Sequence, residues 1–409
     1  MNIYIDLYSN FINKIKNKTE IIESDIPTNI SRNAYLDEQD NYLPVNEIEE
    51  RCFQAVMGCL NRYNINYKII DDTCDENYIY FVPIFDWDFF NSLNNFKIEK
   101  KFLDDIKNKK CKLLIDIPDD GYFKNITIQN LKKWCNDNNI NEDCISIINM
   151  NLKSPDFKNN NFNIYATTIH SEDYILESCI PTEVCSFNNI EKLFLNYNRN
   201  IKRHKFYLGF RLYEYNLIDK GIFSFSNKHF DDALIHKPFD QYSFNFNKLY
   251  DFLLKLPYTI EGENVSQLAD QMLVGMYVEQ SHYPKTFLSL VSESDVDNES
   301  IYLSEKTFKP IVMGHPFILV GSKHSLKKLK EIGYKTFDKW WSEEYDNMEL
   351  FEQRINAIVE ILNDLNTKNI EELIIIREEM QEVIQHNFDL FRKRIKEVNF
   401  TELFKKILS

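Results

Sequence analysis

Residues 301–321, IYLSEKTFKPIVMGHPFILVG, decide the fold that we predict for this chain. An apolar run at 301–303 leads into a polar cluster, a compact segment and a second apolar run at 316–320. This order predicts a strand, a charged turn, a short helix and another strand, which is the repeating unit of an α/β sheet. Ligands of such sheets bind outside the carboxyl ends of the strands, and Glu305 and Lys306 fall at that position.

The polar cluster admits two interpretations. The carboxylate of Glu305 can accept hydrogen bonds from sugar or ribose hydroxyls, and the ammonium of Lys306 can neutralise a phosphate. Alternatively, Ser304 caps a helix and Glu305 complements its dipole. Pro310 would remove a hydrogen bond from the predicted helix, so residues 304–309 could instead form a separate turn, with the regular helix starting nearer the proline.

A second segment strengthens the functional interpretation. Residues 287–294 read FLSLVSES. Together the two segments resemble the donor-binding segment of the α1,3-fucosyltransferase family, in which a Glu-containing turn after one strand precedes a Thr-Glu-Lys turn. Residues 293–294 (Glu-Ser) stand where that family has Glu-Asn, and residues 304–306 (Ser-Glu-Lys) stand where it has Thr-Glu-Lys. The stretch also resembles glycosyltransferase-like proteins of large phages and giant viruses, which carry an EKT-aromatic-KP signature.

The resemblance implies a GT-B-like glycosyltransferase, with two doubly wound Rossmann-like domains, a cleft between them and long C-terminal helices. It implies inversion by direct displacement at the anomeric carbon. The donor would be a nucleotide-diphosphate sugar, GDP-fucose by the nearest named family or another GDP- or UDP-sugar. The acceptor hydroxyl would belong to a glycan, a lipid-linked sugar, a protein or, in a viral protein, a modified DNA base.

The order of the predicted elements supports the same α/β class. Strands alternate with helices over about 180 residues, which implies a mostly parallel, doubly wound domain. We therefore predict an acceptor-side α/β domain at residues 1–188 and a donor-binding α/β domain at 189–346. Residues 347–409 are predicted to be helices that pack across the two domains.

A basic turn opens the second predicted domain. A strand at 192–196 is followed by YNRNIK and then by a helix that starts at His204. Free backbone N–H groups at a helix N-terminus, with arginines beside them, suit an anionic ligand, although both arginines could also be solvated surface charges. The same basic turn recurs in the viral glycosyltransferase-like proteins. The predicted donor-binding residues are Arg199, Arg203, His204, Glu293, Ser304, Glu305, Lys306 and Lys309.

A transferase of this kind needs a general base facing the cleft from the first domain. Asp116, Asp119 and Asp120 lie in DIPDDGY, at the carboxyl end of a predicted strand. Asp, Pro and Gly are also ordinary turn residues, so turn chemistry alone could explain the segment. His170 is a weaker candidate for the base.

Two other classes of function remain open. Asp86 and Asp88 form a DxD pattern after a predicted strand, and residues 295–297 form another. Such a pattern binds a divalent metal and the diphosphate in metal-dependent GT-A transferases. With Arg and Lys side chains neutralising the diphosphate, however, no metal or other cofactor is required. The chain could also be a catalytically inactive module that binds a nucleotide or sugar.

Composition limits the possibilities further. The formal net charge of −15 argues against non-specific nucleic-acid binding as the main activity. No apolar run approaches the ~18 residues that a membrane span needs. The first residues lack the pattern of a secretory signal, and none of the eight cysteines forms a CxxC pair. We therefore expect reduced thiols and a cytoplasmic protein.

Overall fold

The computed structural model divides the chain into two compact α/β units. The first contains the described residues up to Thr167, and the second runs from Thr168 to Glu397. The sequence analysis placed this boundary after residue 188 and separated residues 347–409, whose described part belongs to the second unit. The structure describes residues 3–5, 67–69, 78–83, 98, 100–117, 123–173, 175, 179–187, 189–198, 201–225, 245–260, 278–296 and 299–397.

The first unit is built on a parallel sheet of six described strands, in the order β2-β1-β3-β4-β5-β6. Its first five positions follow the 2-1-3-4-5 order of doubly wound folds. Strand β4 reads CKLLIDI and is almost wholly buried, as expected for a central strand covered on both faces. The elements are β1 (Ile3–Ile5), β2 (Tyr67–Ile69), β3 (Tyr78–Pro83), α3 (Lys100–Lys107), β4 (Cys111–Ile117), α4 (Asn125–Asn138), β5 (Ile145–Asn149) and β6 (Asn163–Ala166), with short 3-10 helices η4 (Glu142–Cys144) and η5 (Ser154–Asp156).

The second unit holds a parallel sheet of four described strands, in the order β10-β9-β7-β8. From β7 the chain moves to β8 on one side, and later from β9 to β10 on the other, so the strand order reverses between β7 and β9. In open α/β sheets, ligands bind outside the carboxyl ends of the strands at such a switch point. The strands are β7 (Lys192–Asn198), β8 (Gly221–Phe225), β9 (Thr286–Ser292) and β10 (Phe317–Val320).

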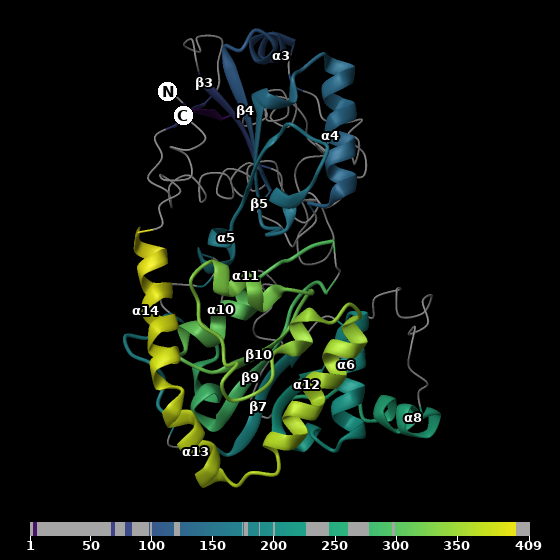
Figure 1. Cartoon of the computed structure of the whole chain (residues 1–409), viewed down its shortest axis with the longest axis vertical. Coiled ribbons are helices and arrows are strands. Elements are labelled where there is room, and N and C mark those ends of the chain that lie inside the picture. The colour runs from purple at the N-terminus through teal and green to yellow at the C-terminus, as the bar shows by residue number, and fades with distance from the viewer. Residues whose placement is uncertain are drawn as a thin grey trace, which may run out of the picture. The chain divides into compact units, whose positions relative to one another are not determined.

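Helices cover both faces of this second sheet. Helices α6 and α12 pack together on one face, and α10 packs with α14 on the other (Figure 1). The C-terminal helices therefore complete the second unit. The helices are α5 (Ile169–Asp173), α6 (Arg203–Glu214), α8 (Phe246–Leu254), α10 (Glu305–Val312), α11 (Ser325–Glu331), α12 (Phe351–Leu365), α13 (Ile370–Glu379) and α14 (Gln381–Glu397), with 3-10 helices η7 (Ile218–Lys220), η8 (Gln280–Lys285) and η9 (Glu344–Asn347).

The segment from which the prediction started differs from it in two respects. Residues 301–303 are buried but form no strand, and the parallel partner of β10 is β9. Helix α10 begins at Glu305 and includes Pro310, so the interpretation of a separate turn is wrong. The proline is tolerated because α10 is short, so that only one intrahelical hydrogen bond is lost, and because the helix is capped strongly at its start.

Two further local patterns are misleading. Residues 230–263 are polar and aromatic, a composition that predicts irregular structure, but they contain α8, whose first turn is capped by the Asn245 side chain accepting from the backbone N–H of Lys248. Residues 333–337, GYKTF, predict a short strand, but none forms in this described segment. Instead, the backbone of Lys335 exchanges two hydrogen bonds of 2.8 Å with the side chain of Asn387 on α14, which takes the place of a neighbouring strand.

The expectations about membrane spans and about cysteine thiols can be compared with the described residues. No helix among them is long and apolar enough to cross a membrane. Their five cysteines are free thiols: Cys111, Cys135, Cys144, Cys179 and Cys185.

Candidate anion-binding site

The candidate site lies at the switch point of the second sheet. The chain leaves β7 at Asn198 and enters α6 with Lys202 at the helix N-cap. It leaves the neighbouring strand β9 at Ser292 and continues into Glu293 and Ser294. The N-terminus of α10 packs against this second exit, because its cap residue hydrogen-bonds to Glu293. Three backbone segments from one unit therefore converge at one edge of the sheet.

Glu293 is the structural centre of this edge. Its side chain is completely buried, and its carboxylate accepts from the backbone N–H of Ser304 (3.0 Å), the hydroxyl of Ser304 (2.5 Å), the hydroxyl of Thr307 and the backbone N–H of Ser294 (3.3 Å). Burial raises the pKa of the carboxyl, against the opposing effects of Lys306 and the two hydroxyls. With these contacts Glu293 holds the start of α10 against the end of β9, a different role from the predicted contact with a sugar or ribose hydroxyl.

The start of α10 follows the capping interpretation. The Ser304 hydroxyl accepts from the backbone N–H of Lys306 at 3.2 Å, and Glu305 occupies the first turn, where a negative charge complements the helix dipole. The Glu305 carboxylate also pairs with the Lys306 ammonium at 3.2 Å, and its side chain is 14% exposed. Glu305 is therefore held in place while its side chain stays within reach of solvent.

His204 links α6 to the end of β9. Its Nε2 lies 2.9 Å from the backbone carbonyl of Glu293, so this nitrogen carries the proton and donates it. Burial, followed by the nearby charge of Lys205, lowers the pKa of the imidazole to about 3. His204 is therefore neutral at physiological pH. It positions the backbone and supplies no positive charge to the site.

Neither predicted arginine is shown to bring positive charge to this edge of the sheet. Arg203 forms an ion pair with Glu352 (3.5 Å) and lies over the ring of Phe351, 5.3 Å from its centroid. Both partners belong to the start of α12, so Arg203 ties α6 to that helix. Arg199 lies outside the described residues, and its predicted role stays a prediction.

Lysines supply the positive charge at this edge. The Lys202 ammonium donates to the backbone carbonyl of Ser294 (2.8 Å), and the Lys306 ammonium donates to the hydroxyl of the same serine (2.9 Å). Lys205 lies one helical turn after Lys202 and is only 4% exposed. Burial, followed by the charges of Lys306 and Lys202, lowers the pKa of its ammonium to about 7. We call Lys202, Lys205 and Lys306 the lysine cluster.

Lys205 differs from the other two lysines in its contacts. No hydrogen-bond acceptor or carboxylate in the described part of the chain pairs with its ammonium, although the side chain is almost fully buried. Lys202 is the N-cap of α6 and Lys205 lies in its first turn, which contains no acidic residue. Cations are disfavoured there by the helix dipole, so the arrangement does not serve helix stability. A buried cation without an acceptor, beside two others, favours an anion.

Lys309 extends the positive region along α10. It lies three residues after Lys306 and four after Glu305, so the three side chains share one face of the helix. Burial lowers the pKa of the Lys309 ammonium to about 8, while Glu305 raises it and Lys306 lowers it. The structure thus brings together five of the eight predicted donor residues, Glu293, Ser304, Glu305, Lys306 and Lys309, with His204 as a neutral support.

Sequence analysis missed Lys202, Lys205, Ser294 and Thr307. A signal was present for the lysines, because residues three apart at a helix start share one face, and KRHK carries two of them. Arginine and histidine in the same run drew attention instead. Ser294 and Thr307 became recognisable only when their contacts with Lys306 and Glu293 were known.

The structure describes only some of the predicted catalytic and metal-binding residues. Asp116 is 1% exposed within β4 of the first unit. In the second DxD pattern, Asp295 accepts from the Ser300 hydroxyl at 2.6 Å. Within the described ranges no group of three or more metal-ligating side chains occurs. Five predicted residues and one side chain lie outside the description: Asp86, Asp88, Asp119, Asp120, Asp297 and the imidazole of His170.

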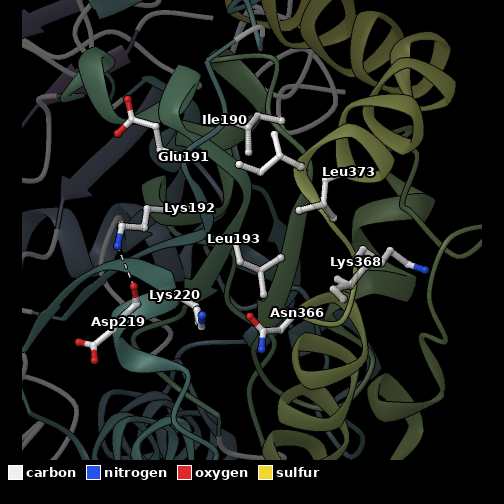
Figure 2. A pocket seen from close by; sticks show the side chains of 11 residues that line it. Ile190, Glu191, Lys192, Leu193, Asp219, Lys220, Asn366, Lys368 and Leu373 are labelled. Carbon is white, nitrogen blue, oxygen red and sulfur yellow. Dashed lines mark hydrogen bonds between the residues drawn. The ribbon is translucent and has the colours of Figure 1, made fainter.

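A cavity of about 210 Å³ lies at the opposite, amino-terminal edge of the second sheet, between the start of β7 and the junction of α12 and α13 (Figure 2). Its Lys192 is exposed and donates to the backbone carbonyl of Asp219 at 2.7 Å. Lys220 and Lys368 also line it, opposite Glu191 and Asp219. This cavity therefore has mixed charge and no buried titratable group, and it does not resemble the lysine cluster.

Comparisons of the chain with family models, with curated proteins and with solved structures found no match. The function is therefore inferred from the chemistry of the site itself. That chemistry comprises a cluster of lysines at a helix N-terminus, a partly exposed carboxylate at Glu305 and a framework built by Glu293 and His204. It can bind and neutralise a phosphate-bearing anion and accept a hydrogen bond from a neighbouring hydroxyl.

Proposed function

We propose that the protein is a glycosyltransferase that binds the diphosphate of a nucleotide sugar at the lysine cluster and transfers the sugar to an acceptor hydroxyl. The observation that carries the proposal is the convergence of Lys202, Lys205 and Lys306 at the switch point of a parallel sheet. Lys205 is buried there without an acceptor. A leaving diphosphate would meet these cations where charge develops as the glycosidic bond breaks.

The electrostatic balance of the chain supports an anionic ligand. The whole chain carries a formal net charge of −15, yet three lysines gather at one edge of the second sheet. The fully buried carboxylate nearby, that of Glu293, is already occupied by serine, threonine and backbone donors. It therefore neutralises the cluster only in part. An entering diphosphate would relieve repulsion among the ammonium groups and supply the acceptor that Lys205 lacks.

Each side chain at this edge of the sheet then has a role in binding the donor. Lys202 and Lys306 hold the diphosphate from two sides of Ser294, whose carbonyl and hydroxyl fix the two ammonium groups. Glu305 accepts from a ribose or sugar hydroxyl, because its carboxylate is partly exposed beside Lys306. Glu293 and His204 hold the framework rigid, so that these contacts need no rearrangement when the ligand binds.

The finer assignment follows the resemblance to the α1,3-fucosyltransferases and the viral glycosyltransferase-like proteins. We propose a GT-B arrangement of the two α/β units, a GDP- or UDP-sugar donor, GDP-fucose among them, and inversion without a required metal. The base would come from the first unit, from Asp116, Asp119 or Asp120. The acceptor is a hydroxyl of a glycan or another molecule, with a modified DNA base as one option, and the protein would work in the cytoplasm.

A thermal-shift titration tests donor binding directly. The purified full chain is heated with GDP, UDP, CMP, ADP or dTDP, each with EDTA or with Mn²⁺. A ligand that binds only the folded state raises the unfolding midpoint by mass action. We expect a metal-independent shift with one nucleoside diphosphate, followed by release of that diphosphate from the matching nucleotide sugar when an acceptor is supplied.

A matched pair of variants locates the site. Lys306→Ala should remove most of the shift, whereas Lys327→Ala, at an exposed position on α11, should retain it. A shift that requires Mn²⁺ would favour the metal-dependent alternative with Asp86 and Asp88. Binding without sugar transfer to any acceptor would indicate a binding module, and the absence of a shift with every nucleotide would reject the proposal.

A further inference from the structure

Lys205 raises a question that diphosphate binding alone does not answer. An ammonium needs hydrogen-bond acceptors, and a buried one without them is costly. The described chain offers Lys205 no such acceptor, although the side chain is almost wholly removed from solvent. The cost falls if the amine gives up its proton, because a neutral amine is buried far more cheaply than an ammonium.

The charges around Lys205 come from three elements. On its own helix α6 it faces Lys202, and across the site it faces Lys306 and Glu305 of α10. Glu293, at the end of β9, is the fourth charged neighbour. The two cations favour the neutral amine, and the two carboxylates favour the ammonium. The cations have the larger effect, and burial acts in the same direction as they do.

A bound anion would reverse this balance. A phosphate oxygen near the Lys205 amine supplies both a negative charge and an acceptor, and each favours the protonated form. The amine would then take a proton from solvent as the anion enters. The transfer forms one N–H bond on Lys205 and removes one proton from the buffer, and no other reactant is needed.

We infer that Lys205 couples anion binding at the lysine cluster to the uptake of one proton, so that the affinity of the site is set by pH. The inference rests on the proposed function for the identity of the ligand, a nucleoside diphosphate. It adds a regulatory property, because the protein would hold its donor more tightly when the solution becomes more acidic. Lys205 acts here as a binding residue, in contact with the diphosphate and not with the acceptor.

Isothermal titration calorimetry of the full chain with GDP, and with UDP if GDP does not bind, measures this coupling. Titrations at pH 8.0 in two buffers with different ionisation enthalpies give the number of protons taken up. Above pH 7.5 the terminal phosphate, with a pKa of about 6, contributes little. We expect nearly one proton per bound nucleotide, and an affinity that falls by up to about tenfold per pH unit between pH 7.5 and 9.

Two variants assign the proton to this residue. Lys205→Met should weaken binding about tenfold at pH 7.5 and abolish proton uptake. Lys205→Arg keeps a positive charge at every pH, so binding should persist without proton uptake. Lys309→Met serves as the control, since the proton uptake at Lys205 should remain in this variant.

The outcomes separate this inference from the proposed function. Nucleotide binding with no proton uptake and a constant affinity from pH 7.5 to 9 would overturn the inference and leave the transferase proposal standing. Proton-linked binding of sulfate without nucleotide binding would support the inference and reject the nucleotide-sugar site. Proton uptake that survives in Lys205→Met and disappears in Lys309→Met would assign the proton to Lys309. That result would overturn the inference.

Discussion

The two edges of the second sheet present opposite kinds of site. At the amino-terminal edge there is a measurable cavity, but its lysine Lys192 is exposed and bonded to a carbonyl of its own unit. At the carboxyl edge, Lys205 is buried, lacks an acceptor in the described structure and has a pKa lowered to about 7. The described cavity and the lysine with the lowered pKa are therefore found at opposite ends of the same strands.

The difference separates two signals: the topology of the sheet and the lowered pKa of Lys205 point to the carboxyl edge, whereas the described cavity lies at the other edge. Parallel strands bring the ends of β7 and β9 together at a switch point, where two helix starts and their N–H groups meet. At the other edge the chain only turns back into the strands. Four measurements can sharpen or break this comparison.

The largest change in the free energy of unfolding is expected from Glu293→Ala. The substitution leaves the hydroxyls of Ser304 and Thr307 and two backbone N–H groups without their buried acceptor. The free energy of unfolding should fall by about 3 to 5 kcal/mol in urea denaturation. Glu305→Ala is the matched control and should cost less than about 1 kcal/mol, because it removes a partly exposed ion pair. Equal losses in the two variants would contradict the framework role of Glu293.

The next largest effect is the pH dependence that Lys205 gives to the free energy of unfolding. The pKa of Lys205 is about 7 in the folded protein and has the ordinary lysine value of 10.5 in the unfolded chain, so between these pH values the unfolded chain binds more protons. Lys205 therefore makes the folded state less stable below pH 7, and this penalty fades as the pH rises towards 10.5. Lys205→Met should be more stable than the parent by on the order of 2 kcal/mol at pH 6.5, with the advantage shrinking at pH 9.5. Urea unfolding at both pH values measures this, and a constant difference would contradict a buried titrating amine.

Lys306→Ala tests the carboxyl edge as a binding site. Loss of one charge-assisted contact should weaken the binding of the preferred nucleoside diphosphate by about 1 to 3 kcal/mol. Calorimetry at pH 7.5 measures the change. Because Lys306 is partly exposed, its removal should alter the free energy of unfolding far less than Glu293→Ala. Unchanged affinity would place the ligand elsewhere.

The smallest effect is expected at the amino-terminal edge. Lys192→Met removes one exposed hydrogen bond to the Asp219 carbonyl, so the free energy of unfolding should change by less than about 0.5 kcal/mol. Nucleotide affinity should also stay unchanged in the same calorimetric assay. A clear loss of binding would show that the cavity of Figure 2, and not the lysine cluster, holds the ligand.

Local patterns predicted much of the second unit because its strands are short, apolar and buried. The runs before Glu293 and after Gly314 became β9 and β10, and Ser304 became the cap of α10, as its residue type favours. Residues 301–303 show the limit of such patterns. An apolar run is compatible with a strand or with any other buried segment, and the contacts of its neighbours decide between these possibilities.

The sequence by itself determined the α/β class, the parallel sheets and the region in which charged residues meet, since these follow from periodicity and from the position of polar residues after strands. The tertiary structure alone decided the role of each residue there. Burial makes His204 neutral, Glu352 holds Arg203 on α12, and Glu293 serves as the support of α10. Lys205 gained its importance only from folding, because a pKa depends on burial and on neighbours distant in the chain, which a single sequence does not specify.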